Sequence, residues 1–142
     1  MPTMTVFSPT IPAPGSTLPA LYVSHGAPLF ALEAGVTGPA LTRWGSALRA
    51  QSPGLRGAII MSPHWMAPGV RVGTGAQPAT LHDFGGFPPE LYQLQYPAPG
   101  SPALAGEVLD LLHTAGIEAE GDAKRPFDHG AWVPLMHLFP QA

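Results

Sequence analysis

The chain has 142 residues, of which only 11% are charged, and a formal net charge of −3. This length is enough for one domain with its own hydrophobic core, and without a basic cluster we expect no nucleic-acid partner. The absence of cysteine excludes disulfides, thiolate nucleophiles and cysteine-ligated zinc or iron–sulfur sites, which leaves His, Asp and Glu as the candidate metal ligands.

The N-terminal residues 1–17 are expected to form a flexible arm, and residues 18–142 a single domain. The start of the chain has no basic region followed by an apolar one. No uninterrupted apolar stretch reaches about 18 residues. We therefore expect no signal peptide, no membrane partner and a cytoplasmic location.

The first part of the predicted domain has the order strand, helix, strand. The apolar runs Ala20–Ser24 and Gly57–Met61 predict two buried strands. Between them, Gly38-Pro39 predicts the start of a helix. The apolar residues on one face of this helix are Leu41, Trp44 and Leu48. This order indicates a parallel, right-handed β-α-β unit, and the alternating residues Val70–Thr74 predict a further strand at an edge.

A long segment rich in aromatic residues and proline follows at Thr80–Gly100, with the sequence TLHDFGGFPPELYQLQYPAPG. Loops of this length in a compact domain are usually functional or disordered, and the aromatic residues favour a functional loop. Ser101-Pro102 then predicts the cap of a second helix, which ends at Gly116. Its apolar face is formed by Leu104, Val108, Leu111 and Leu112.

The last predicted elements are a strand at Ile117–Glu120 and an apolar helix after Asp128-His129-Gly130. The residues that share a face of this helix are Trp132, Leu135, Met136 and Phe139. Together the elements predict an α/β fold with a mostly parallel or mixed central sheet flanked by helices. The chain stops where the alternation would require another central strand, so the sheet is expected to be incomplete.

Two histidines follow the predicted buried strands. His25 and His64 lie at their carboxyl ends, and such ends of parallel strands meet at one edge of the sheet, where α/β proteins bind ligands. Two neutral imidazoles suit a divalent metal such as iron, zinc or copper, and leave open positions for substrate or dioxygen. The alternative is that each histidine is only a turn residue. No HxH or HExxH motif decides between the two interpretations.

A third histidine, His129, follows Asp128 at the start of the last predicted helix. In one interpretation Asp128 caps the helix and His129 is solvated. In the other, Asp128 orients His129, which transfers a proton in the same crevice. His82-Asp83 is equally ambiguous, with the loop role favoured. The histidines expected to be structural are His113 and His137.

Four segments resemble, in order, the DODA-type extradiol aromatic ring-opening dioxygenases, the 4,5-DOPA dioxygenase group with a LigB-like catalytic domain. The segments are LYVSHGAP, IIMSPHW, TLHDFGGFPPELYQLQYPAPGSPALA and FDHGAWVPL. The resemblance implies a non-haem metal enzyme that uses dioxygen to open a catechol such as DOPA next to its two hydroxyls.

The resemblance implies that His25 and His64 bind the metal and that His129 acts in the active site. Three further residues are candidates for the substrate pocket or for supporting its residues: Asp128, His82 and Asp83. Iron(II) suits the reaction better than zinc(II), because zinc has no redox chemistry, although zinc is the alternative bound metal.

Members of this family are roughly twice as long as this chain. Their second halves supply the remaining strands, a further active-site histidine and the last metal ligand. The resemblance therefore implies that this chain is an N-terminal half. Self-association or a second chain would complete its fold. One alternative is a truncated, non-catalytic metal- or ligand-binding remnant. A zinc hydrolase is less favoured, because no positioned nucleophile or P-loop is evident.

Overall fold

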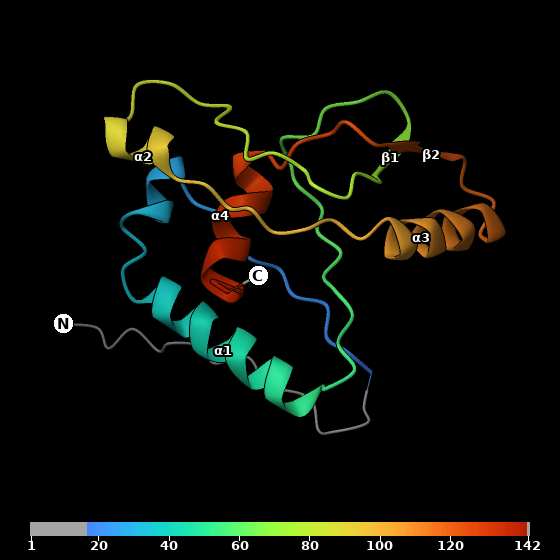
Figure 1. The fold of residues 1–142 in the computed structure, drawn as a ribbon, viewed down its shortest axis with the longest axis horizontal. Helices are drawn as coiled ribbons and strands as arrows, with labels where there is room; N and C mark the ends of the chain where they lie inside the picture. Colours follow the sequence, from blue (N-terminus) through green and yellow to red (C-terminus); the bar gives the residue numbers. More distant parts are fainter. Residues whose placement is uncertain (1–16, 142) are drawn as a thin grey trace.

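The computed structural model describes residues 17–141, in which helices surround a central helix and flank one small sheet (Figure 1). The predicted arm, apart from Thr17, lies outside the described residues. The elements in chain order are the 3₁₀ helix η1 (Pro28–Ala31), α1 (Thr37–Gln51), β1 (Val70–Gly73), α2 (Pro89–Gln93), α3 (Pro102–Thr114), β2 (Ala119–Asp122) and α4 (His129–Leu138). Among the described helices, none is long and apolar enough to cross a membrane.

Helix α4 lies at the centre of the molecule (Figure 1). The side chain of Asp128 caps it by accepting a hydrogen bond from the backbone nitrogen of Ala131 at 3.2 Å. Trp132 and Val133 on this helix are fully buried. The main buried cluster around them also contains Ala31, Leu91, Tyr96, Ala98 and Leu135. Fully burying a side chain the size of valine stabilises the fold by about 1.5–3 kcal/mol, so the buried residues of α4 contribute to core stability.

Helix α1 packs closely against α4 through its predicted apolar face. Trp44 and Leu48 are buried against Leu138 in a second cluster. A Cβ atom at Gly45 would collide with the backbone carbonyl of Leu138, so glycine permits this close approach. The hydroxyl of Thr42 donates a hydrogen bond to the carbonyl of His137 at 2.8 Å.

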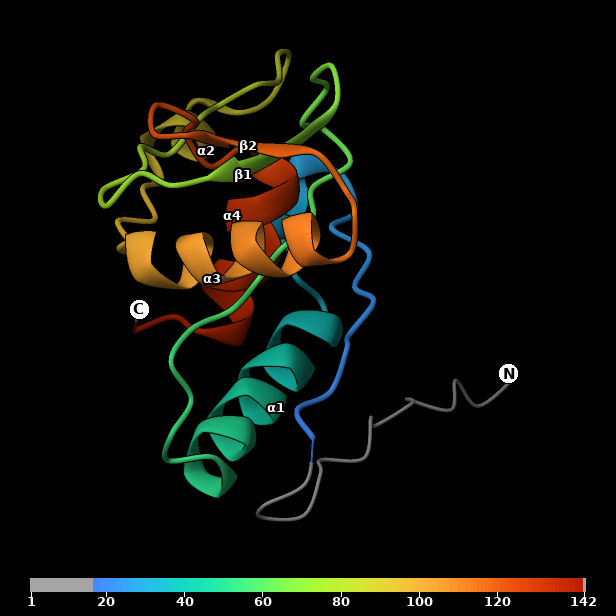
Figure 2. The same cartoon turned by 90° about the vertical axis from the view of Figure 1, so that its right-hand side faces the viewer.

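The sheet consists of β1 and β2, which pair in parallel from Val70 opposite Ala119 to Gly73 opposite Asp122. Helix α3 packs against both strands, and Figure 2 shows it running below them. The predicted strand at 70–74 is confirmed, and the one predicted at 117–120 lies slightly later in the chain. A parallel sheet flanked by helices confirms the predicted α/β class.

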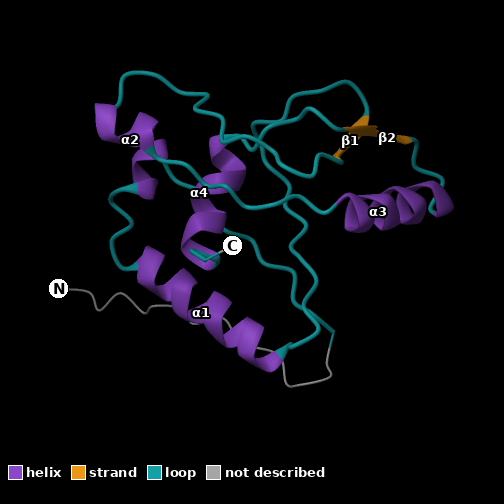
Figure 3. Ribbon diagram, viewed as in Figure 1, coloured by secondary structure: helices purple, strands orange, loops and turns teal. Residues whose placement is uncertain are grey.

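The strands predicted at Ala20–Ser24 and Gly57–Met61 are wrong. Both segments are extended but form no ladder within the described part of the chain, and Figure 3 shows them as loops. The physical reason is that a strand is stable only when neighbours satisfy its backbone groups and cover its side chains. Here Tyr22 is 97% exposed and Met61 93% exposed. The expected β-α-β unit around α1 is therefore absent from residues 17–141, and the two segments line an open groove of about 1030 Å³.

The aromatic segment 80–100 is ordered and tied to the start of α4. Thr80 forms a parallel bridge with Phe127, whose carbonyl accepts a hydrogen bond from the backbone nitrogen of Leu81 at 2.8 Å. The indole nitrogen of Trp132 donates to the carbonyl of Leu81 at 2.9 Å. These contacts fix residues 82–84 beside the first turn of α4.

Candidate metal centre

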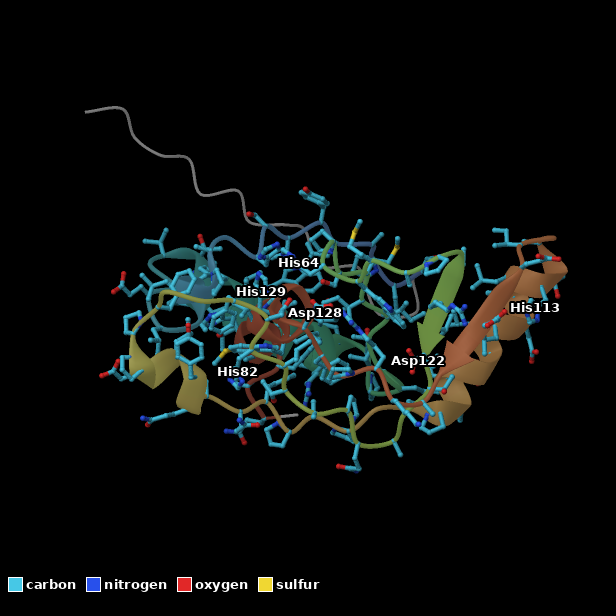
Figure 4. The ribbon with its side chains drawn as sticks, turned by 90° about the horizontal axis from the view of Figure 1, so that it is seen from above. His64, His82, His113, Asp122, Asp128 and His129 are labelled. Atoms are coloured by element: carbon cyan, nitrogen blue, oxygen red, sulfur yellow. The ribbon has the colours of Figure 1, made fainter. Side chains whose placement is uncertain are left out.

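The structure brings His25, His64 and His129 together. One ring nitrogen of each lies within 4.8 Å of those of the other two. The Nε2 atoms of His25 and His64 are 3.1 Å apart, and Figure 4 shows His64 and His129 close to each other. Two nitrogens bound to one tetrahedral zinc ion at 2.0–2.1 Å lie about 3.3 Å apart, so the spacing of His25 and His64 suits two ligands of one ion.

The turns that carry His25 and His64 are built locally. Gly26 has a φ of +62°, a left-handed conformation that glycine adopts without strain, and it turns the chain from His25 into η1. The hydroxyl of Ser62 accepts a hydrogen bond from the backbone nitrogen of His64 at 3.2 Å. Each histidine is thus fixed by its own turn, although the preceding segments form no strands.

His129 is the first residue of α4 and is only 4% exposed. The Oδ1 atom of Asp83 accepts two hydrogen bonds from it, from the backbone nitrogen at 2.9 Å and from the ring Nδ1 at 3.0 Å. Burial acts to raise the pKa of Asp83, but these hydrogen bonds outweigh it and hold the pKa below its usual value. The ring partner of His129 is therefore Asp83 rather than Asp128.

Asp128 instead joins the turn before His64 to α4. Its carboxylate is 2% exposed and accepts hydrogen bonds from the hydroxyl of Ser62, from Nη2 of Arg125 at 2.5 Å and from the backbone of Ala131. The guanidinium of Arg125 also lies over the ring of Trp65, 5.0 Å from its centroid. These contacts leave the buried carboxylate well satisfied, as the cost of burying a charge requires.

Gly130 allows the turn of His64 to lie directly against α4. A Cβ atom at this position would lie 2.8 Å from Cδ2 of His64 and would also collide with the hydroxyl of Ser62. A larger residue would fit only if the Ser62–His64 turn shifted, and the ring of His64 lies with its centroid 4.0 Å from that of His129.

The environment of His25 favours its neutral form. Burial lowers its pKa below 6.5, and the nearby His129 and His64 lower it further. Neutral imidazole is the form that binds a metal ion. In addition, Nδ1 of His25 is buried without a partner among the described residues. Three converging imidazoles are a donor set that fits iron(II) or zinc(II) and leaves coordination positions open.

An aromatic wall borders the histidine cluster. The ring of Phe84 meets the ring of His129 edge-on, with centroids 5.6 Å apart, and Phe87 and Tyr92 pack against Phe84. His82 lies outside the cluster, because its Nε2 is 2.9 Å from the carbonyl of Leu94 and its ring packs against aromatic neighbours. The loop therefore supplies Asp83 and an apolar surface to the site.

Four residues of the site had no predicted role: Ser62, Phe84, Arg125 and Gly130. Ser62, Phe84 and Gly130 lie inside the segments that carry the family resemblance. Their closeness in sequence to a candidate histidine was the only sequence feature that could have indicated a role in the site. Arg125 had no such signal, because its role depends on contacts with Asp128 and Trp65 in space.

Comparison with known proteins places these residues in a family. Residues 19–142 match the model of the catalytic LigB subunit of aromatic ring-opening dioxygenase. The 4,5-DOPA dioxygenase extradiol of Escherichia coli (strain K12) is 39% identical over 125 residues, 88% of this chain and 44% of that protein. The protein of the same name from Beta vulgaris is 38% identical over 123 residues, 85% of this chain and 45% of that protein.

A more distant relative, Dioxygenase tasH of Hapsidospora irregularis, is 35% identical over 88 residues, 61% of this chain and 27% of that protein. The chain thus spans less than half the length of these relatives. Because the family model covers nearly all of the described residues, the predicted relationship is confirmed, and the chain belongs to the family of catalytic LigB subunits of aromatic ring-opening dioxygenases.

Proposed function

We propose that residues 18–142 are the N-terminal portion of a LigB-like catalytic domain that opens the ring of a catechol such as DOPA with dioxygen. The observation that carries the proposal is the convergence of His25, His64 and His129, with ring nitrogens within 4.8 Å of one another. The names of the relatives, 4,5-DOPA dioxygenase extradiol, support the substrate class.

In this proposal His25 and His64 hold the metal through Nε2. Iron(II) is the preferred ion, because it supplies the redox chemistry toward dioxygen that zinc(II) lacks. His129 exchanges a proton with a hydroxyl of the catechol, the general acid–base role that histidine most often takes in enzymes. Phe84 provides an apolar surface beside His129 on which an aromatic ring can pack.

Completion of the fold is part of the same proposal. The groove between residues 18–24 and 55–63 is lined mainly by apolar side chains, and the relatives are more than twice as long as the region they share with this chain. Further strands, from a continuation of the chain or from a second chain, would pair with the two extended segments and cover Tyr22 and Met61.

The test measures oxygen uptake and the visible absorbance of a ring-opened product, with iron(II) and a panel of catechols. The chain is assayed alone and with its natural continuation, where the gene encodes one. We expect turnover with iron(II), none with zinc(II), and loss of turnover in His25→Ala and His64→Ala. Failure of the continued form to turn over any catechol would contradict the proposal.

A second candidate is a non-catalytic metal-binding remnant, which the open groove and the exposed Tyr22 and Met61 favour. Metal analysis separates the two candidates. A bound ion that depends on His25 and His64, with no turnover in any form, supports the remnant. An ion together with turnover supports the enzyme.

A further inference from the structure

The contact between Asp83 and His129 indicates which ring nitrogen of His129 carries the proton. We propose that Asp83 is a positioning residue that holds His129 as the Nδ1–H tautomer, so that Nε2 carries the free lone pair and His129 acts toward a ligand as an acceptor. The tautomer stands on the hydrogen bonds of this chain, whereas its use in catalysis rests on the proposed function.

A single carboxylate oxygen of Asp83 is bonded to two nitrogens of His129. Oδ1 of Asp83 lies 2.9 Å from the backbone nitrogen of His129 and 3.0 Å from its ring Nδ1. The backbone N–H can only donate, and an ionised carboxylate can only accept. Nδ1 must therefore carry the proton that it shares with Asp83. In the neutral ring this leaves Nε2 without a proton.

Three other histidines of the same chain have a different hydrogen-bond pattern. His82, His113 and His137 each place Nε2 within 2.9–3.0 Å of a backbone carbonyl, of Leu94, Ala119 and Phe30 respectively. Because a carbonyl only accepts, these three rings carry the proton on Nε2. His129 is expected to have the opposite tautomer, so the three other histidines are internal references.

The ring of His129 is confined by its neighbours. His129 is 4% exposed, and the edge of Phe84 packs against its ring. Asp83 also satisfies a backbone N–H in the first turn of α4, a position where a carboxylate is favoured by the helix dipole. A flip of the ring would break the bond to Nδ1. Asp83 therefore fixes the main chain and the ring of His129 together.

The loop that carries Asp83 has other attachments, so the contact can be tested by substitution. Leu81 is bonded through its backbone to Phe127 and to the indole of Trp132. These bonds do not involve the side chain of Asp83. A variant at Asp83 is therefore expected to keep the loop in place and to change mainly the ring of His129.

In the proposed reaction, the free lone pair on Nε2 makes His129 a proton acceptor when the substrate arrives. A catechol hydroxyl within reach would give its proton to Nε2, and Asp83 would stabilise the imidazolium that results. Asp83 itself stays ionised throughout. With the opposite tautomer, Nε2 would present a proton to the substrate and could not accept one.

The experiment is long-range ¹H–¹⁵N correlation NMR of the ¹⁵N-labelled, metal-free full chain, which reports the tautomer of each histidine. The spectrum is recorded at about pH 8, above the usual imidazole pKa, where tautomers of the neutral ring are compared. We expect Nδ1–H for His129 and Nε2–H for His82, His113 and His137. A proton on Nε2 of His129 in the unmodified chain would overturn the proposal, and this result requires no variant to fold.

Variants then test the role of Asp83. Asp83→Asn keeps an oxygen facing the backbone N–H of His129, so we expect it to retain the Nδ1–H tautomer. Asp83→Ala should convert His129 to a mixture containing Nε2–H. The matched control is Asp110→Asn on the exposed side of α3, which should leave the spectrum of His129 unchanged. An unchanged tautomer in Asp83→Ala, with intact signals from the reference histidines, would contradict the positioning role.

A zinc titration of the same samples separates this inference from the proposed function. The expected tautomer without any zinc binding would support the role of Asp83 and count against the metal site. Zinc binding with the opposite tautomer would support the metal site and overturn the role of Asp83.

Discussion

Replacing Asp128 with alanine would remove the acceptor that joins Ser62, Arg125 and the first turn of α4. The carboxylate is 2% exposed and receives three hydrogen bonds. Loss of the helix cap costs about 0.5–2 kcal/mol. Removing one partner of a buried ion pair costs about 3–5 kcal/mol. Because the side chain of Arg125 is 21% exposed and can regain water, the lower end of each range applies, and we expect a total loss of about 3.5 kcal/mol.

The assay is urea unfolding followed by far-ultraviolet circular dichroism, with Asp110→Ala on α3 as the control. The control should change the free energy of unfolding by less than about 0.5 kcal/mol, because the side chain of Asp110 is exposed. Asp128→Asn, which keeps an oxygen acceptor, should lie between the two. A loss below about 1 kcal/mol in Asp128→Ala would refute the view that this carboxylate ties the turn of His64 to α4.

Three other outcomes follow from the structure. Gly130→Ala should destabilise the fold by about 1–3 kcal/mol in urea unfolding and should weaken zinc binding, because its Cβ would lie 2.8 Å from the ring of His64. An unchanged zinc affinity would count against the close packing of His64 on α4. Gly45→Ala should lower the free energy of unfolding by a similar amount, because its Cβ would collide with the carbonyl of Leu138. Alanine favours helix more than glycine does, so a gain in stability would contradict the observed contact between α1 and α4. The pKa of His25 in the folded state is lowered by burial and by the neighbouring histidines. Below about pH 6.5 the unfolded state therefore binds more protons than the folded state. The free energy of unfolding should fall as the pH decreases through the pKa of the folded state. Urea unfolding between about pH 7.5 and 5 measures this loss, which should be smaller in His25→Asn.

The helices could be predicted because their signals are local. Helix α1 shows apolar periodicity, and α3 begins at a serine that caps it by accepting from the backbone of Leu104. Asp128 likewise caps α4. The strands β1 and β2 were predicted within a few residues. The segments 20–24 and 57–61 have the composition of strands, but strand formation depends on a neighbour, which composition does not encode.

The candidate metal site was predictable only in part. His25 and His64 were predicted to meet at the edge of a sheet, and they do meet, although their segments form no ladder. Their turns are encoded locally by Gly26 and Ser62, and α4 holds them together. The bond between Asp83 and His129 spans 46 positions in sequence, so no local pattern could have preferred it over the adjacent Asp128.

The most direct test of the account is the stoichiometry and affinity of divalent metal binding, measured by isothermal titration with zinc(II) and anaerobically with iron(II). The chain and its His113→Gln variant, which alters a histidine bonded to the carbonyl of Ala119 away from the site, should each bind one ion. His25→Ala and His64→Ala should each bind it at least about tenfold more weakly. Binding of no ion, or equal binding by all four proteins, would contradict the claim that these histidines form a metal centre.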